Sequence, residues 1–183
     1  NMKKIFPLIM LAVGSFFIYS CDNNDNIIVQ NQVETNKMLD ITGTLSNSNN
    51  FAINQGITIQ KNDIVLVYRR VGNAWQMIPK NYYLDDVANY PSGRELEYNF
   101  VFDTSKVQIR TESNFNQATE ITPSEATNYL INQTFRVVLV PAEKGQVNKT
   151  SGNVSKTLDY SDYNAVSKYY NLSESQVKTV TIK

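Results

Sequence analysis

The chain has 183 residues, with 17 lysines and arginines against 17 aspartates and glutamates, one cysteine and no histidine. The lack of histidine argues against serine–histidine hydrolases, zinc hydrolases and haem proteins, because it removes the usual general base and the commonest transition-metal ligand. The balanced charge and the lack of any basic run argue against nucleic-acid binding, which needs a cationic surface.

The first segment along the chain is an apolar run with a positive start. Two lysines precede an almost uninterrupted apolar stretch over residues 5–19. This stretch is shorter than the roughly 20 residues that cross a bilayer as a helix. A positive start, an apolar core of about 7–15 residues and a small residue at its end are typical of a secretory signal peptide. We therefore predict that residues 1–20 are a signal peptide that is removed.

The end of this run carries the only cysteine of the chain. The sequence from Ile18 to Cys21 resembles the lipobox of bacterial lipoproteins, although Tyr19 departs from the alanine or serine usual at that position. The resemblance implies cleavage before Cys21 and a lipid anchor on its sulfur, so that the membrane is an expected partner. A lone cysteine in an exported chain lacks a disulfide partner, and stable anchoring takes two or more acyl chains. The alternative is a secreted protein with a free thiol at Cys21.

Residues 21–37 predict a flexible tether, because they are polar, rich in amides and without periodicity. The acidic and amide residues directly after Cys21, DNNDN, are similar to the surface-export signal of lipoproteins of the Bacteroidota. That similarity implies a position on the outer face of the outer membrane. A simple spacer on the periplasmic face is the alternative. We expect one β-rich domain over residues 38–183.

Short β-type runs recur through this domain, separated by turn residues about every 10 positions. They cover residues 38–45, 51–60, 63–71, 75–84, 95–103, 106–112, 133–142 and 177–183. Pro79 predicts an edge or a break within its run, and the continuous apolar run 133–142 predicts a central strand buried on both faces. This spacing favours an antiparallel β-sandwich, immunoglobulin-like or related, over β–α–β units.

The run 95–103 alternates most cleanly, and the turn that follows it is short enough for a hairpin to 106–112. Its apolar face comprises Leu96, Tyr98, Phe100 and Phe102.

Two short helices are expected, over residues 122–131 and 161–172. The first has Thr122 as N-cap, a proline at the first helical position and Glu125 three residues after the cap. The second begins after a capping Ser161 or Asp162.

Four segments carry a resemblance to a known family: DIVLVYRRVGNAWQMIP (63–79), ELEYNFVFD (95–103), FRVVLVPA (135–142) and DYSDYNAVSKYYNL (159–172). Together they resemble a family of small, uncharacterised lipoproteins from flavobacteria and related Bacteroidota. The resemblance covers roughly residues 1–175. It implies a lipoprotein of this kind and carries over no activity and no functional residue.

Aromatic side chains near the two central prolines are candidates for ligand binding, since exposed aromatic faces suit sugar rings. The candidates are Trp75, Tyr82, Tyr83 and Tyr90. The alternative is that these rings fill the core of the sandwich.

Carboxylates provide two further candidate sites, each with a simpler alternative. Asp85 and Asp86 could bind Ca²⁺, or form a solvated acidic turn. A glycosidase pair would have to come from Glu95, Glu97, Glu120 and Glu125. Glu95 and Glu97 share a strand face, at about 6.5–7 Å by strand rise, near the separation in inverting glycosidases. A polar loop at residues 144–156 could serve in recognition or could be a hairpin tip.

The sequence thus predicts a surface lipoprotein with a non-catalytic binding or accessory module for a glycan or protein partner, and with no cofactor and no metal. A structural component of an envelope complex is the alternative. A carbohydrate-active enzyme that uses only carboxylates is less favoured.

Overall fold

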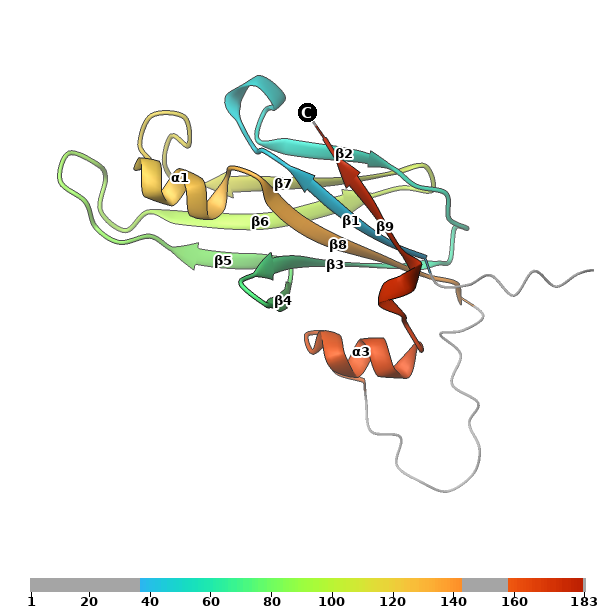
Figure 1. The fold of residues 1–183 in the computed structure, drawn as a ribbon. Coiled ribbons are helices and arrows are strands. Elements are labelled where there is room, and N and C mark those ends of the chain that lie inside the picture. Colours follow the sequence, from blue (N-terminus) through green and yellow to red (C-terminus); the bar gives the residue numbers. More distant parts are fainter. Residues whose placement is uncertain (1–36, 143–157, 183) are drawn as a thin grey trace, which may run out of the picture. The chain divides into compact units, whose positions relative to one another are not determined.

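The computed structural model describes residues 37–142 and 158–182, which belong to one compact unit, Glu34–Lys183 (Figure 1). The predicted signal peptide, the lipidation site Cys21, the tether up to Asn36 and the predicted loop 144–156 lie outside the described residues. In the part of the chain that the structure describes, no helix is long and apolar enough to span a membrane.

The described strands form two sheets, so the predicted mainly β, sandwich-like fold with short helices is confirmed. The five-stranded sheet has the order β4-β3-β8-β1-β9, and the four-stranded sheet has the order β2-β7-β6-β5. The strands of the first are β1 (Lys37–Gly43), β3 (Ile64–Val71), β4 (Ala74–Met77), β8 (Gln133–Val140) and β9 (Val177–Thr181). Those of the second are β2 (Ala52–Gly56), β5 (Lys80–Tyr83), β6 (Glu95–Phe102) and β7 (Lys106–Ser113). The described pairs are antiparallel except β1 with β9, which run parallel.

The break predicted at Pro79 is where the chain changes sheets. Before it, β4 pairs with β3 in the five-stranded sheet; after it, β5 pairs with β6 in the four-stranded sheet. The Ile78–Pro79 peptide bond is cis. Since proline has no backbone N–H for a sheet ladder, the single predicted run 75–84 becomes two edge strands of different sheets.

The core lies between the two sheets and is built from alternating strand residues. Its fully buried members include Ile41, Val67, Phe135 and Val137 from one sheet and Ile53, Leu96, Tyr98 and Ile109 from the other. The predicted apolar face of β6 is therefore confirmed at Leu96 and Tyr98. Phe102 departs from it and is 47% exposed. The reason is that β5 pairs with β6 only as far as Tyr98, so no described strand borders the rest of β6 on that side.

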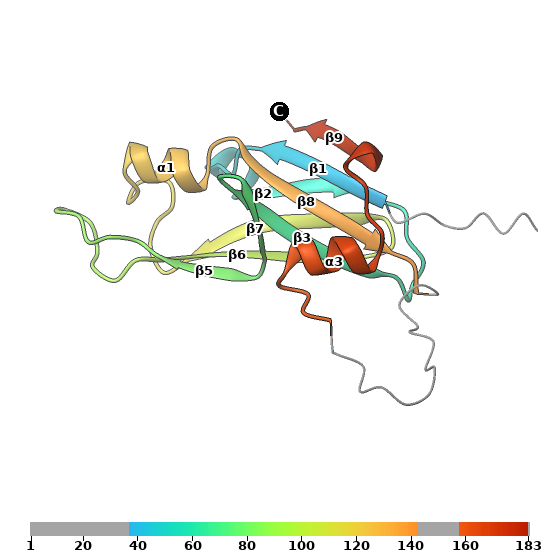
Figure 2. The same ribbon diagram turned by 60° about the horizontal axis from the view of Figure 1, so that its bottom comes forward.

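A second apolar layer covers the outer face of the five-stranded sheet. The helix α3 (Tyr163–Tyr169) lies beside β3 and β8 in Figure 2 and packs Tyr163, Val166 and Tyr170 against them. This layer explains the burial of both faces of β8, as the continuous apolar run 133–142 predicted.

Local signals place both described α-helices correctly. At the start of α1 (Pro123–Tyr129), the backbone N–H of Glu125 donates to Thr122 Oγ1 at 3.2 Å, and the N–H of Thr122 donates to Glu125 Oε2 at 2.8 Å. At the start of α3, Asp162 is the N-cap and accepts from the N–H groups of Asn164 and Ala165. Two 3₁₀ turns, η1 (Asn47–Asn49) and η2 (Glu174–Gln176), complete the described elements.

Candidate functional site

Three arginines of the sandwich are buried: Arg69, Arg94 and Arg136 are each at most 5% exposed. Each guanidinium lies over aromatic rings. A buried cation is unfavourable unless opposite charge and hydrogen bonds compensate it. The partners of each arginine therefore indicate whether it is a structural group.

Arg136 lies on the outer face of β8 and is neutralised by two carboxylates. It donates to Asp40 at 2.7 and 2.8 Å and to Glu174 at 2.5 and 2.9 Å. It also donates to the Tyr163 hydroxyl at 2.6 Å and lies 4.3 Å from the centre of the Trp75 ring. Burial lowers the pKa of Arg136, but these partners outweigh it and raise the pKa. The contacts join β1, β8, η2 and α3, so Arg136 is a structural group.

Arg94 lies at the end of the loop between β5 and β6 and has one carboxylate partner. It donates to both oxygens of Glu125 at 2.7 and 2.9 Å, and to the carbonyls of Glu120 and Asp85. Burial raises the pKa of Glu125, but hydrogen bonds from Arg94 and Thr122 lower this pKa by a larger amount. The net result is a pKa below the ordinary value of a glutamate. Arg94 therefore fixes the loop to the start of α1.

Arg69 points between the sheets from β3 and differs from the other two. Its Nε and Nη2 donate to Gln133 Oε1 at 3.1 and 2.7 Å, Nη2 to the carbonyl of Asn128 at 2.5 Å, and Nη1 to the Tyr82 hydroxyl at 3.0 Å. The rings of Tyr98, Tyr82 and Tyr129 lie 4.8, 5.2 and 5.6 Å from its central carbon. Within the described residues, no carboxylate forms an ion pair with Arg69.

A polar groove of about 510 Å³ opens beside Arg69; we call it the Arg69 groove. It is lined by Arg69, Arg70, Val71, Gly72, Tyr82, Thr127, Asn128, Tyr129, Ile131, Asn132, Gln133 and Thr134. This lining contains two arginines and no acidic residue. Its volume lies in the range of small-molecule sites, about 300–1,000 Å³. The Arg69 groove is thus a concave, cationic and hydrogen-bonding surface.

A second groove, of about 640 Å³, follows β4 and contains Trp75; we call it the Trp75 groove. Its lining is mainly apolar: Val71, Ala74, Trp75, Gln76, Met77, Ile78, Pro79, Lys80 and Ser161. The Trp75 ring is half-buried and packs on Arg136 and on Tyr163, with ring centres 5.9 Å apart in the latter pair. Trp75 therefore belongs to the second apolar layer beneath α3 and not to the core between the sheets.

The structure distributes the four predicted aromatic candidates over different surfaces. Trp75 lines the Trp75 groove, whereas Tyr82 lines the Arg69 groove and also packs against the core. Tyr83 is 75% exposed. Tyr90 lies 5.1 Å from the guanidinium of Arg94, and its hydroxyl donates to the carbonyl of Ile121 at 3.4 Å. Among the four, only Tyr82 shares the lining of its groove with a buried arginine, Arg69.

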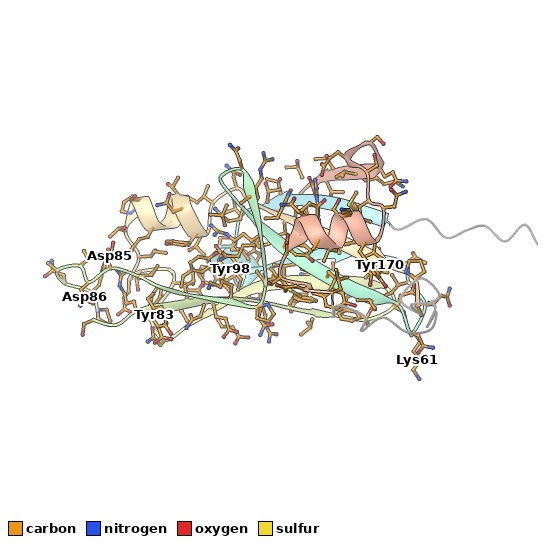
Figure 3. The ribbon with its side chains drawn as sticks, turned by 90° about the horizontal axis from the view of Figure 1, so that it is seen from below. Lys61, Tyr83, Asp85, Asp86, Tyr98 and Tyr170 are labelled. Carbon is orange, nitrogen blue, oxygen red and sulfur yellow. The ribbon has the colours of Figure 1, made fainter. Side chains whose placement is uncertain are left out.

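The predicted calcium ligands, Asp85 and Asp86, form hydrogen bonds across the loop after β5. Figure 3 shows Asp85 and Asp86 on this loop, with Tyr98 nearer the middle of the strands. Asp86 Oδ1 accepts from the N–H of Gly93 at 2.9 Å, and the Asp85 carbonyl accepts from Arg94 at 2.8 Å. No group of three acidic side chains able to hold a metal ion occurs in the described ranges 37–142 and 158–182.

Three of the four glutamates considered for a glycosidase pair have structural partners. Glu95 accepts from Asn81 at 2.8 Å, Glu120 accepts from the N–H of Asn116 at 2.7 Å, and Glu125 binds Arg94. Glu97 lies opposite Asn81 and Glu112 in the register of its sheet. The Arg69 groove contains none of these glutamates, so its chemistry is binding by a cation, amides, hydroxyls and aromatic rings.

No protein-family model, no curated protein and no solved structure matches the chain. The functional proposals below therefore depend on the residues and their geometry.

Proposed function

We propose that the protein is a surface lipoprotein, anchored through Cys21, whose β-sandwich is a non-catalytic binding or accessory module for a glycan or protein partner. The observation that supports binding is the Arg69 groove, where a buried guanidinium has no carboxylate partner among the described residues and borders an open concave surface. Concave sites with a few converging polar groups are the usual places where ligands bind.

A non-catalytic role agrees with the residue types of the chain. There is no histidine. The groove offers hydrogen-bond donors and acceptors, but neither an acidic residue nor a cysteine to act as general base or nucleophile. Such a lining can hold and orient a ligand without transforming it.

The proposed location follows from the residues before the sandwich. The positive start, the apolar run over residues 5–19 and the lone Cys21 support export and lipidation. The acidic and amide residues after Cys21 support display on the outer face of the outer membrane of a Bacteroidota-like cell. The proposed family of small lipoproteins from these bacteria agrees with that location.

Two measurements on cells that produce the full chain test the location. We expect the intact mass of the purified protein to equal a chain that begins at Cys21 with two or three acyl groups, and protease added to whole cells to remove the domain. Cys21→Ala is the matched control and should yield a chain without lipid. A wild-type chain without lipid would refute the anchor, and a lipidated chain protected from protease would place it on the periplasmic face.

Binding is tested with the same full-length protein in detergent on a glycan array and by crosslinking on intact cells. We expect a glycan or an envelope protein to be retained by the wild-type chain. The binding role is refuted if both experiments recover no ligand.

A structural role in an envelope complex is the second candidate, because one end of β6 exposes apolar side chains. Val101 and Phe102 are each 47% exposed, and the Phe102 ring stacks on Phe100 with centres 6.2 Å apart. Among the described strands, none pairs with this end of β6 on the β5 side. A stable protein partner that is lost on Phe102→Ser, and retained on a substitution in the Arg69 groove, would favour this candidate.

A further inference from the structure

We infer that the Arg69 groove is an anion site that binds the carboxylate or sulfate group of an acidic saccharide. This inference rests on the proposed binding function and specifies the class of ligand. It follows from a buried guanidinium that has no carboxylate partner among the described residues and that lines a groove together with amides, hydroxyls and tyrosine rings.

The charge of the Arg69 groove is the first argument. Arg136 forms ion pairs with two carboxylates, and Arg94 forms an ion pair with one. No described carboxylate pairs with Arg69. Gln133 and the Asn128 carbonyl satisfy N–H groups of Arg69, but they are neutral dipoles and leave the formal charge in place. An anion in the groove would supply the missing opposite charge, which is most favourable where water is largely excluded.

The hydrogen-bonding capacity of Arg69 is the second argument. A guanidinium has five N–H donors. Four hydrogen bonds run from these donors to neighbouring groups: two to Gln133, one to Asn128 and one to Tyr82. The Tyr98 hydroxyl is a further neutral partner of Arg69. Nη1, which carries two N–H groups, donates to the Tyr82 hydroxyl, and Tyr82 also lines the groove. An oxyanion there would accept a charge-assisted hydrogen bond, the stronger kind.

The rest of the lining favours a saccharide as the carrier of the anion. Thr127, Asn128, Asn132 and Thr134 contribute amides and hydroxyls, which donate and accept as sugar hydroxyls do. Tyr82 and Tyr129 contribute aromatic rings, and such rings combine an apolar face with a polar hydroxyl. This combination matches a ring-shaped, hydroxylated ligand that carries one negative group.

The test uses a charge substitution at the rim, because a substitution of Arg69 itself could unfold the sandwich. Asn132 is exposed, lines the groove and has a φ of 50°. Aspartate tolerates this left-handed conformation nearly as well as asparagine does. Asn132→Asp therefore adds a negative charge to the groove with little effect on folding.

Asn171→Asp is the matched control. Asn171 is also exposed and has a φ of 52°, but it lies outside the lining of the Arg69 groove. The two variants have the same net charge and the same kind of backbone position. A difference between them reports the local charge of the groove and not the overall charge of the protein.

Titration of full-length protein in detergent uses two pairs of probes: oligogalacturonate with its methyl ester, and dextran sulfate with dextran. We expect at least one acidic member to bind and its neutral counterpart not to bind. Asn132→Asp should weaken that binding by about tenfold or more, as for like charges in contact, and Asn171→Asp should not.

Equal binding of a neutral probe, or equal affinity of the two variants, would overturn the anion site and leave the proposed binding function standing. Failure of both acidic probes to bind would also overturn it. In that case the array and crosslinking experiments still decide whether the protein binds another ligand. Which acidic probe binds distinguishes a carboxylate from a sulfate.

Discussion

The two carboxylates on Arg136 should contribute very unequally to stability, although both contact the same guanidinium. The side chain of Arg136 is 3% exposed and that of Asp40 is 15% exposed, whereas that of Glu174 is 72% exposed. Breaking a buried pair costs about 3–5 kcal/mol. Since Glu174 still offsets the charge, we expect Asp40→Asn to lower the free energy of unfolding by about 2 kcal/mol. Glu174→Gln should lower it by less than about 1 kcal/mol, as for exposed pairs.

Urea unfolding at neutral pH measures both values, and added salt separates them further. Salt should reduce the contribution of the exposed Glu174 and leave that of Asp40 nearly unchanged. The double variant should lose more than the sum of the single losses, because Arg136 then has no carboxylate left in the described structure.

Equal losses for the two single variants, or a larger loss for Glu174→Gln, would refute the reasoning. Such a result would mean that exposure does not determine the strength of the two contacts. Asp40 is also directly opposite Arg136 in the antiparallel pairing of β1 with β8, whereas Glu174 reaches it from η2. The register thus gives an independent reason to expect the larger effect at Asp40.

Three further predictions concern other parts of the sandwich. The pKa of Glu125 is lower in the folded protein than its ordinary value, so its ionised form stabilises the fold above the ordinary pKa, and this stabilisation is lost as the pH falls through the folded pKa. The difference in unfolding free energy between wild type and Glu125→Gln should therefore shrink from about pH 7 to about pH 3. Phe135→Ala, at a fully buried core position, should lower the unfolding free energy by about 3–5 kcal/mol in urea. Tyr83→Ser should change the same quantity by no more than about 0.5 kcal/mol, because Tyr83 is 75% exposed.

Local chemistry allowed the helices and the clearest strands to be predicted from the sequence. Thr122 and Glu125 form the predicted capping box because both hydrogen bonds join residues three apart in the chain. The hairpin between β6 and β7 also depends on a short turn, in which Asp103 Oδ1 accepts from the N–H groups of Ser105 and Lys106. Such contacts are determined by neighbouring residues and leave a direct pattern in the sequence.

Which sheet each strand joins depends on residues far apart in the chain, and this assignment determined where the aromatic candidates lie. Trp75 and Tyr82 are close in the sequence, but Pro79 lies between them and the chain changes sheets there. Neither the alternation of apolar residues in the run 75–84 nor the proline within it predicts which sheet each half of that run joins. The parallel pairing of β1 with β9 joins distant segments and is likewise invisible to local patterns.

The sequence held a signal for the buried arginines that the predictions did not use. Arg136 interrupts the apolar run 133–142, and a charge in a strand buried on both faces requires a buried partner. Arg69 and Arg70 are adjacent, so a strand directs them to opposite faces. Burial confirms this alternation, since Arg69 is buried and Arg70 is exposed. What the sequence could not provide is the identity of the partners, which come from residues up to 96 positions away.

The contrast among the three arginines also bears on function, because hydrogen bonding alone does not separate them. Each donates to several acceptors and lies over aromatic rings, so each is well packed. They differ in how the positive charge is compensated: Arg94 and Arg136 form ion pairs with carboxylates from other elements, and a structural role is enough to explain these pairs. A structural role accounts less well for Arg69, since a cation on neutral partners is disfavoured in a buried site. A negatively charged ligand in the Arg69 groove would compensate the buried positive charge. The free energy gained in this way would contribute to the affinity for that ligand.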